Sequence, residues 1–315
     1  MDQTPVTADM WSGSCPILQY DHRTVDASLL NQQTKPHFNA VFLTDTGYRR
    51  DHNEDSGVVN RESAFFAVAD GLGGHQAGEI ASSVCCQEIN AQVTAGIPLE
   101  TSIQLAHEKI YEVAHGNNMG TTLVTLQLIG NRYEIGWVGD SRVYLLRQGL
   151  TQLTTDHSLV QELVDSGELA HSAAESSSIK NILSQALGLE GNIEPETCYG
   201  EIEKGDVFLL CSDGLTNELS DSQIERWLRQ GVGVDEIARG LVNDALAAGG
   251  KDNVTVVIVR VESAAKPDQE DVDPMMSKLS VSKTSSNKNI YSLMAIGSGL
   301  ALFAAAVLVW FVKGS

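Results

Sequence analysis

Short apolar runs separated by turn signals fill residues 40–262, and this pattern limits the folds that the chain can adopt. The runs are rich in β-branched and aromatic residues, which favours strands. Three of them follow one another between residues 121 and 146, with turn signals at 130–131 and 139–140, which is typical of an antiparallel meander. The predicted strands cover residues 65–69, 121–128, 133–138, 142–146, 207–211 and 254–261.

Amphipathic helical patterns lie between these runs. The predicted helices cover residues 78–93, 102–115, 158–166, 222–229 and 234–247. Because several strands follow one another with few helical crossovers, we expect antiparallel sheets with helices packed outside them. This arrangement belongs to the α+β class rather than to the doubly wound class.

The two ends of the chain differ from this central part. Residues 1–39 are polar and without periodicity, and they contain no basic segment followed by an apolar one, so we expect an N-terminal extension and no signal peptide. Residues 263–289 are rich in Ser, Lys, Asp and Pro, which predicts a flexible juxtamembrane linker.

Residues 290–312 are 23 residues without a charge. As a helix they would span about 34 Å, enough for a hydrocarbon core of about 30 Å, so they predict one transmembrane helix in contact with the lipid bilayer. Three lysines precede this segment (Lys278, Lys283 and Lys288) and one follows it (Lys313). This bias predicts a single-pass protein of the inner or plasma membrane with its bulk in the cytoplasm.

The charge balance of the chain argues against one class of binding partner. The chain has 21 basic and 41 acidic residues, a formal net charge of -20, which argues against nucleic acid as a partner. The excess acid serves either solubility or the binding of cations. The five cysteines contain no C-x-x-C pair, which argues against a zinc ribbon and a disulfide framework and fits a reducing compartment.

Several acids stand at the ends of predicted strands. An isolated Asp-Gly after a strand is usually a turn, but the repetition in one chain favours a shared site. Carboxylates that converge are costly unless a proton or a metal relieves their repulsion. Oxygen ligands without His or Cys select Mg²⁺ or Mn²⁺. The acids concerned are Asp70, Asp140, Asp213 and Asp252, with the pair Glu54 and Asp55 upstream.

The motifs around these acids occur in a recognisable order. They are R-x-x-N-E-D (50–55), FFAVADGLGGH (65–75), GTT (120–122), VGDSR (138–142), DHS (156–158), SDGL (212–215) and KDNVTVV (251–257). The set resembles the bacterial branch of the metal-dependent protein phosphatases, the PPM or type 2C family. The resemblance covers residues 40–262. It implies a four-layer α-β-β-α sandwich of two antiparallel sheets flanked by helices, with a two-metal centre at one end.

The resemblance also implies the ligands of that centre. Asp70 matches the carboxylate that bridges both metals, and Gly71 matches the ligand that binds through its backbone carbonyl. Glu54 matches a ligand of the second metal. Asp213 and Asp252 match ligands of the first metal. The expected cofactor is therefore Mn²⁺ or Mg²⁺, two ions with a third as an open alternative.

Four further positions match residues around these ligands. Asp140, together with Asp213, matches the looser third-metal site of bacterial members. Asp55 matches a residue that holds a metal-bound water, and Asn253 matches an amide that orients the site. Arg50 matches the arginine that binds the substrate phosphate, so Arg50 and Asp70 are the predicted catalytic residues.

Two positions depart from the family pattern. Eukaryotic members place a general-acid histidine two residues after the bridging aspartate, where this chain has Leu72. His75 is the candidate general acid; a solvent-facing loop histidine and a metal-bound water as the acid are the alternatives. Residues 165–187 match the flap that tunes substrate access, and Gln185 stands where bacterial relatives usually carry arginine.

The predicted activity follows from the two metals. Two divalent ions lower the pKa of a shared water, and the resulting hydroxide attacks the phosphorus of phosphoserine or phosphothreonine. The resemblance therefore implies a protein serine/threonine phosphatase that acts on phosphoproteins, with a serine/threonine kinase system as partner.

Other kinds of protein fit the sequence less well. A thiolate phosphatase needs Cys-x₅-Arg, and none of the cysteines is followed by arginine at that spacing. A structural calcium site needs a D-x-[DN]-x-[DN]-G loop, which is absent. The alternative of a non-catalytic scaffold that binds phosphoproteins or a kinase remains, although this chain keeps every expected ligand position.

Overall fold

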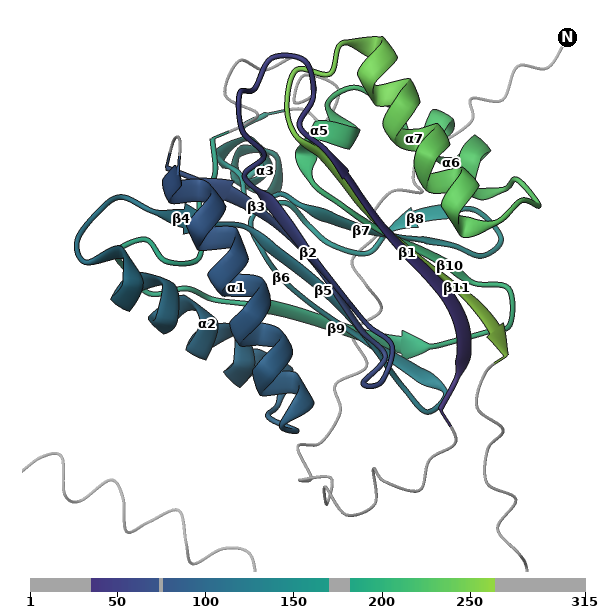
Figure 1. Ribbon diagram of the computed structural model, residues 1–315, viewed down its shortest axis with the longest axis horizontal. Helices are drawn as coiled ribbons and strands as arrows, with labels where there is room; N and C mark the ends of the chain where they lie inside the picture. Colours follow the sequence, from purple (N-terminus) through teal and green to yellow (C-terminus); the bar gives the residue numbers. More distant parts are fainter. Residues whose placement is uncertain (1–34, 74–75, 170–181, 264–315) are drawn as a thin grey trace, which may run out of the picture. The chain divides into compact units, whose positions relative to one another are not determined.

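The structure of the chain, a computed structural model, describes residues 35–73, 76–169 and 182–263. Within these residues two antiparallel sheets lie face to face, and helices cover their outer faces (Figure 1). The fold is α+β, and the four layers α-β-β-α that the resemblance implies are confirmed for the described part of the chain.

The first sheet has five strands in the order β1-β11-β10-β7-β8. Every neighbouring pair runs antiparallel. Strand β11 lies between β1 and β10 and is buried on both faces, which explains its nearly continuous run of valine and isoleucine. The strands are β1 (His37–Asp45), β7 (Arg142–Leu146), β8 (Leu150–Gln152), β10 (Val207–Cys211) and β11 (Val254–Ser263).

The second sheet has the order β2-β3-β5-β6-β9, and the short strand β4 pairs with the end of β3. Its pairs are also antiparallel. The strands are β2 (Asp55–Asn60), β3 (Phe65–Leu72), β4 (Gly120–Thr121), β5 (Leu123–Ile129), β6 (Arg132–Val138) and β9 (Glu196–Glu201).

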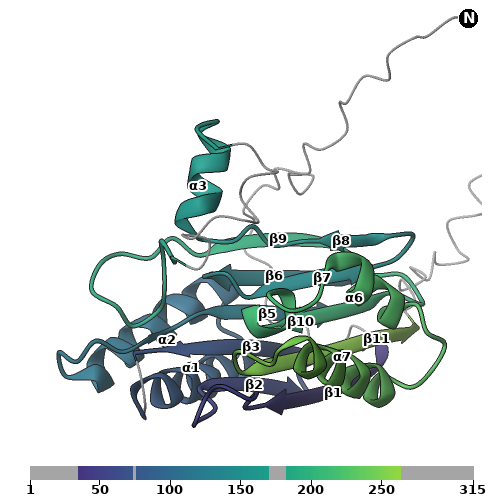
Figure 2. The same cartoon turned by 90° about the horizontal axis from the view of Figure 1, so that it is seen from above.

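Helices cover the outer face of each sheet, as the two views show (Figures 1 and 2). Helices α1 (Gln76–Thr94) and α2 (Leu99–Ala114) pack on the second sheet. Helices α5 (Asp213–Thr216), α6 (Asp221–Leu228) and α7 (Val234–Ala248) pack on the first. Helix α3 (Leu159–Asp165) follows β8 and is capped by Ser158, whose side chain accepts a hydrogen bond from the backbone of Gln161.

Alternation along the strands builds three layers of core. Phe66 and Val68 of β3 face the other sheet, whereas Phe65 and Ala67 face α1 and α2. This period of two is the strand rule, with both faces apolar because both are covered. The core is therefore continuous from one helical layer through both sheets to the other.

The sequence-based elements agree with the structure except at sheet edges, at breaks within strands and at the short helix α5, which was not predicted. The run 121–128 is two strands, because Thr122 turns its backbone amide and hydroxyl toward Asp70. Strands β1, β2, β8 and β9 were not predicted; each lies at a sheet edge, where partial exposure weakens the apolar pattern. Strand β1 begins at His37, so the folded part starts slightly before the predicted boundary at residue 40.

Among the helices of residues 35–73, 76–169 and 182–263, none is long and apolar enough to cross a membrane. The predicted span 290–312, the linker from residue 264 onward and residues 1–34 of the predicted extension lie outside the described residues.

Candidate metal centre

The strand-end acids meet because the ends of neighbouring antiparallel strands lie together. Asp55 begins β2 and is paired directly with Asp70 near the end of β3. Asp213 follows β10, and Asp252 precedes β11, which is the antiparallel partner of β10. The electrostatics reflect this convergence across the two sheets, because the charges of Asp55, Asp213, Asp140 and Asp252 all raise the pKa of Asp70.

Burial and mutual repulsion make these carboxylates costly to ionise. Burial raises the pKa of Asp55 to about 7, that of Asp140 to about 8 and that of Asp213 to about 6. Burial, followed by the charge of Asp55, raises the pKa of Asp70 well above its ordinary value. Such a group of acids is stabilised by protons or by cations that replace them.

Asp70 is held at both of its backbone groups. Its amide donates to the Thr122 hydroxyl at 3.0 Å, and its carbonyl accepts from the Thr122 amide and the Thr121 hydroxyl, each at 2.8 Å. The Thr122 hydroxyl also lies 2.7 Å from that of Ser141. These contacts explain the two threonines of the GTT motif, to which sequence reasoning gave no role.

Asp55 lies in a buried polar network. Its Oδ2 accepts a 2.8 Å hydrogen bond from Ser212, whose hydroxyl also accepts from the Thr255 amide. Its other oxygen, Oδ1, is buried and has no hydrogen-bond partner among the described residues. A buried carboxylate oxygen without a donor is costly, and a cation or a water held by one would satisfy it.

Gly71 lies where three backbone segments meet. Its amide donates to the Glu54 carbonyl at 3.1 Å. A Cβ at this position would stand 2.2 Å from the Gly78 carbonyl oxygen and 2.5 Å from that of Glu54. Only glycine therefore fits, and the close approach fixes Glu54, the end of β3 and the start of α1 relative to one another.

Asn253 joins the loops that carry the other predicted ligands. Its Oδ1 accepts from the Glu54 amide at 2.8 Å, and its Nδ2 donates to the carbonyls of Thr46 and His52 at 2.8 and 3.0 Å. Its own amide donates to Asp252 Oδ1 at 2.9 Å. The side chain is only 4% exposed, so water cannot readily replace these bonds.

We expect Asn253→Ala to lower the free energy of unfolding by about 2–4 kcal/mol, because it removes the side-chain partner of the Glu54 amide and of the Thr46 and His52 carbonyls. Urea unfolding of the metal-free chain measures this loss. Asn253→Asp keeps an acceptor for Glu54 but loses both donors, so it should also be destabilised. Unchanged stability in both variants would contradict the joining role.

Arg50 lies at the edge of the cluster. Its Nη2 donates to Asp252 Oδ2 at 2.8 Å, and its side chain is 50% exposed. The hydrogen bond to Asp252 raises the pKa of the guanidinium. The ion pair therefore positions the half-exposed guanidinium of Arg50 beside the carboxylates. Its other N–H donors can face solvent.

The turn that carries Asp140 is supported from the next strand. Arg142 binds both oxygens of Asp156 through Nε and Nη2, at 2.7–3.1 Å, and its Nη1 donates to the Tyr144 hydroxyl at 3.1 Å. The DHS and VGDSR motifs contained this pair, but their spacing alone did not indicate that they contact each other. Such bidentate bonds are strong and directional.

Some residues predicted for the site lie outside the described residues or make other contacts, and the described side chains do not form a complete metal site. His75 and residues 170–181 of the flap lie outside the described residues, whereas Gln185 accepts from the Glu194 amide. His52 is exposed and contacts Asn253 through its carbonyl. Among the described Asp, Glu, His and Cys side chains, no three converge as a preformed metal site. The acids are coupled electrostatically, but their side chains are not closed around one point.

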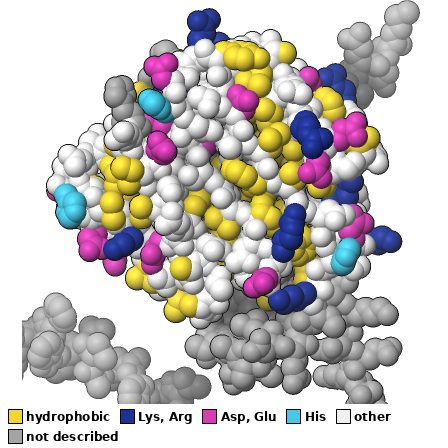
Figure 3. Space-filling view, in the orientation of Figure 1, with side chains coloured by type: hydrophobic (Ala, Val, Ile, Leu, Met, Phe, Trp, Pro, Cys, Tyr) yellow, Lys and Arg dark blue, Asp and Glu magenta, His cyan; other side chains and the backbone are white. Residues whose placement is uncertain are grey.

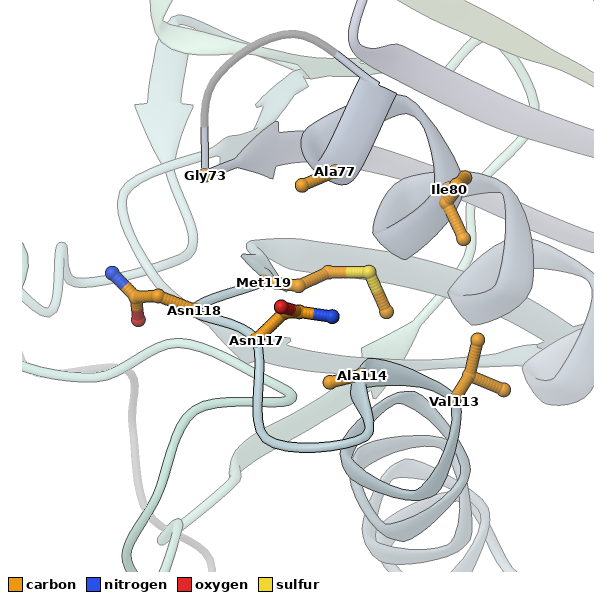
Figure 4. Close-up of a pocket in the computed structure, with 8 residues that line it drawn as sticks. All are labelled: Gly73, Ala77, Ile80, Val113, Ala114, Asn117, Asn118 and Met119. Carbon is orange, nitrogen blue, oxygen red and sulfur yellow. The ribbon is translucent and has the colours of Figure 1, made fainter.

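A cavity of about 510 Å³ lies between the start of α1 and the end of α2, beside Gly73 (Figure 4). Its lining consists of small and apolar side chains with Asn117 and Asn118, and none of the lining residues is titratable. This cavity therefore offers no acid–base side chain, whereas the carboxylate cluster does. On the face shown in Figure 3, acidic and basic side chains are interspersed.

Comparison with known proteins shows which family the chain resembles. Residues 48–248 match the family described as Protein phosphatase 2C. The serine/threonine phosphatase Stp of Listeria monocytogenes is 40% identical over 246 residues, which cover 72% of this chain and 97% of Stp. The crystal structure of the Mycobacterium tuberculosis serine/threonine phosphatase PstP/Ppp has a TM-score of 0.66 at 36% identity, covering 71% of this chain and 99% of PstP.

A second structure, the catalytic domain of PstP in complex with 2 manganese ions, has a TM-score of 0.64 at 36% identity and covers 71% of this chain and 98% of its own. The motifs, the two-sheet fold and these comparisons lead to one conclusion. The chain belongs to the protein phosphatase 2C family.

Proposed function

We propose that the carboxylate cluster is the two-metal centre with which this chain, a metal-dependent protein serine/threonine phosphatase, hydrolyses phosphoserine and phosphothreonine. The observation that carries the assignment is the grouping of five strand-end acids, in which the charges of Asp55, Asp140, Asp213 and Asp252 all raise the pKa of Asp70. The relatives are named serine/threonine phosphatases, which supports the substrate class.

The residues present suit Mn²⁺ or Mg²⁺. The donors are carboxylates, a backbone carbonyl and no sulfur or imidazole, which is the chemistry of hard cations. The partnerless buried oxygen of Asp55 also suits a cation or a water held by one. In this assignment Asp70 would be a ligand shared by both ions, Gly71 and Glu54 would hold the second ion, and Asp213, Asp252 and Asp140 would be the remaining ligands.

Different residues of the chain have different roles in the proposed reaction. Bound divalent cations supply a Lewis acid that activates water for in-line attack on phosphorus. Arg50 orients the phosphate by donating two hydrogen bonds to its equatorial oxygens. Asn253 and the two threonines keep the ligand-bearing loops in place, and the general acid remains His75 or a water.

Phosphate release from a phosphothreonine peptide tests the proposed function. The purified full-length chain should release phosphate with Mn²⁺ present and stop when the metal is chelated. A chain that binds Mn²⁺ but releases no phosphate from phosphoserine or phosphothreonine peptides would indicate the scaffold alternative instead.

Metal removal should also change stability. A cation bound only by the folded state at 100 times its dissociation constant stabilises by about 2.7 kcal/mol. For a domain of this size, that corresponds to a rise in Tm of about 5–10 °C. Calorimetric scans of the metal-free chain, without and with added Mn²⁺, measure the difference in Tm. The same Tm in both samples would contradict a cation site at the buried acids.

We also propose that residues 37–263 form the phosphatase domain and that residues 290–312 anchor it to the inner or plasma membrane, with the domain in the cytoplasm. The uncharged span and the lysines before it support this placement. Tethering would raise encounter with membrane-bound signalling proteins such as a serine/threonine kinase. Retention in the membrane pellet after alkaline extraction, lost on truncation after residue 263, tests the anchor.

A further inference from the structure

His157 makes a two-way contact with the turn that carries Asp140. The His157 amide donates to the Gly139 carbonyl at 2.9 Å, and the Gly139 amide donates to the ring nitrogen Nδ1 at 3.2 Å. The histidine is only 6% exposed, and its ring lies beside that of Trp137, with 6.4 Å between the ring centroids. Gly139 directly precedes Asp140, so these two hydrogen bonds fix the backbone next to Asp140.

The hydrogen bonds specify one form of the imidazole ring. Because Nδ1 accepts from Gly139, the proton of the neutral ring is on Nε2. Nε2 lies 3.0 Å from Glu196 Oε1, to which it donates. Glu196 is the first residue of β9, so the neighbouring strand holds the ring in the orientation that Gly139 requires.

Gly139 is constrained from its other side as well. Its φ of +104° is one that residues with a Cβ rarely adopt, and a Cβ there would stand 2.7 Å from the Thr122 side chain. Thr122 in turn holds the backbone of Asp70. The Asp140 turn is thus fixed between His157 and the residue that positions Asp70.

The same histidine contacts the C-terminal end of the predicted flap, residues 165–187. Its carbonyl accepts from the Ser184 amide at 2.9 Å. Three residues further on, the amide and carbonyl of Leu187 exchange hydrogen bonds with Thr121, at 2.8 and 3.0 Å. His157 therefore lies between the Asp140 turn and the chain that leads back to the Asp70 strand.

We propose that His157 is a positioning residue for Asp140: its Nδ1 holds the Gly139 amide, and this bond sets the direction in which the Asp140 carboxylate is presented to a divalent cation. The inference rests on the proposed function, in which Asp140 is a ligand. It predicts that the Mn²⁺ affinity of the weakest site, the third one, in which Asp140 is a ligand, depends on a hydrogen-bond acceptor at the Nδ1 position. The bulk of the imidazole should not affect this affinity.

Two substitutions of His157 separate these properties. Asn has an oxygen near the position of Nδ1 and can still accept from Gly139, whereas Gln reaches toward Glu196 and places no acceptor there. Calorimetric titration of the full-length chain with Mn²⁺ alone is the readout. We expect His157→Gln to raise the dissociation constant of the weakest site by about 10-fold, as the loss of an orienting partner does. His157→Asn should stay within about 2-fold of the unsubstituted chain.

The Tm of each metal-free variant shows whether folding alone explains the result. Equal Mn²⁺ binding by both variants, or an effect that follows Tm and not the acceptor, would overturn the proposal. Glu196→Gln keeps an acceptor for Nε2 and should bind Mn²⁺ as the unsubstituted chain does; an effect as large as that of His157→Gln would assign the role to the Glu196 charge instead. If the unsubstituted chain bound no Mn²⁺, the proposed function would fail first, and this inference with it.

Discussion

Asp70→Asn is expected to lower Mn²⁺-dependent phosphate release by more than about 100-fold, because the loss of residues that merely orient a ligand already costs 10- to 100-fold. The substitution keeps the size of the side chain but halves its oxygen donors and removes its charge. In the assignment above it takes one ligand from each of two ions. Titration with Mn²⁺ should show weakened binding at both sites and not at one.

Asp206→Asn is the matched control for this substitution. Asp206 is also a buried acid next to β10, 1% exposed, but it lies at the opposite end of the strand from Asp213 and pairs with Arg147 at 2.7 Å. Its loss should destabilise the fold and leave Mn²⁺-dependent turnover of the folded protein unchanged. Equal activity of Asp70→Asn and the unsubstituted chain would remove Asp70 from the centre.

Arg50→Ala is expected to have the second-largest effect, a fall in kcat/KM of about 10- to 100-fold. A hydrogen bond to a charged group contributes about 1.5–3 kcal/mol, and the phosphate loses such bonds here. Arg50→Lys keeps the charge but not the fork of donors, so it should recover only part of the loss. Kinetics on a phosphothreonine peptide, with inorganic phosphate as competing ligand, measure both effects.

The neighbouring Arg49→Ala controls for a general change in surface charge, since Arg49 is exposed and adjacent in the chain. Its kcat/KM should remain within about 2-fold of the unsubstituted chain, because the median exposed ion contact contributes little. If Arg49→Ala and Arg50→Ala lower kcat/KM equally, the basic charge of the loop governs phosphate binding, and not the fork of donors on Arg50.

Much of the fold was predictable from the sequence because both faces of most strands are covered. Strand β10 and strand β7 have the bounds that were predicted, since Val207–Cys211 and Arg142–Leu146 are almost wholly buried. Strand β9 was missed because ETCYGE lies at a sheet edge, contains few apolar residues and buries only Cys198. Edge strands leave little periodic signal in one sequence.

The acids of the candidate site, and Asn253 as an amide beside them, could be named from the sequence, but the contacts that support the acids could not. Asp70 and Asp213 stand after strong apolar runs, and their convergence follows from antiparallel pairing once the two sheets are known. The contacts of Asn253, Thr122 and His157 join segments far apart in the chain, and no spacing rule indicates them. Arg142 and Asp156 occurred in separate motifs, and only the structure brings them together.

The most direct test of the central claim is anomalous diffraction from crystals of this chain grown with Mn²⁺. Two manganese peaks about 3.5–4 Å apart, as in two-metal sites generally, should flank the Asp70 carboxylate. One should lie next to the Gly71 carbonyl and Glu54, and the other next to Asp213 and Asp252. Manganese bound elsewhere, or density around the strand-end acids that contains only water, would contradict the account.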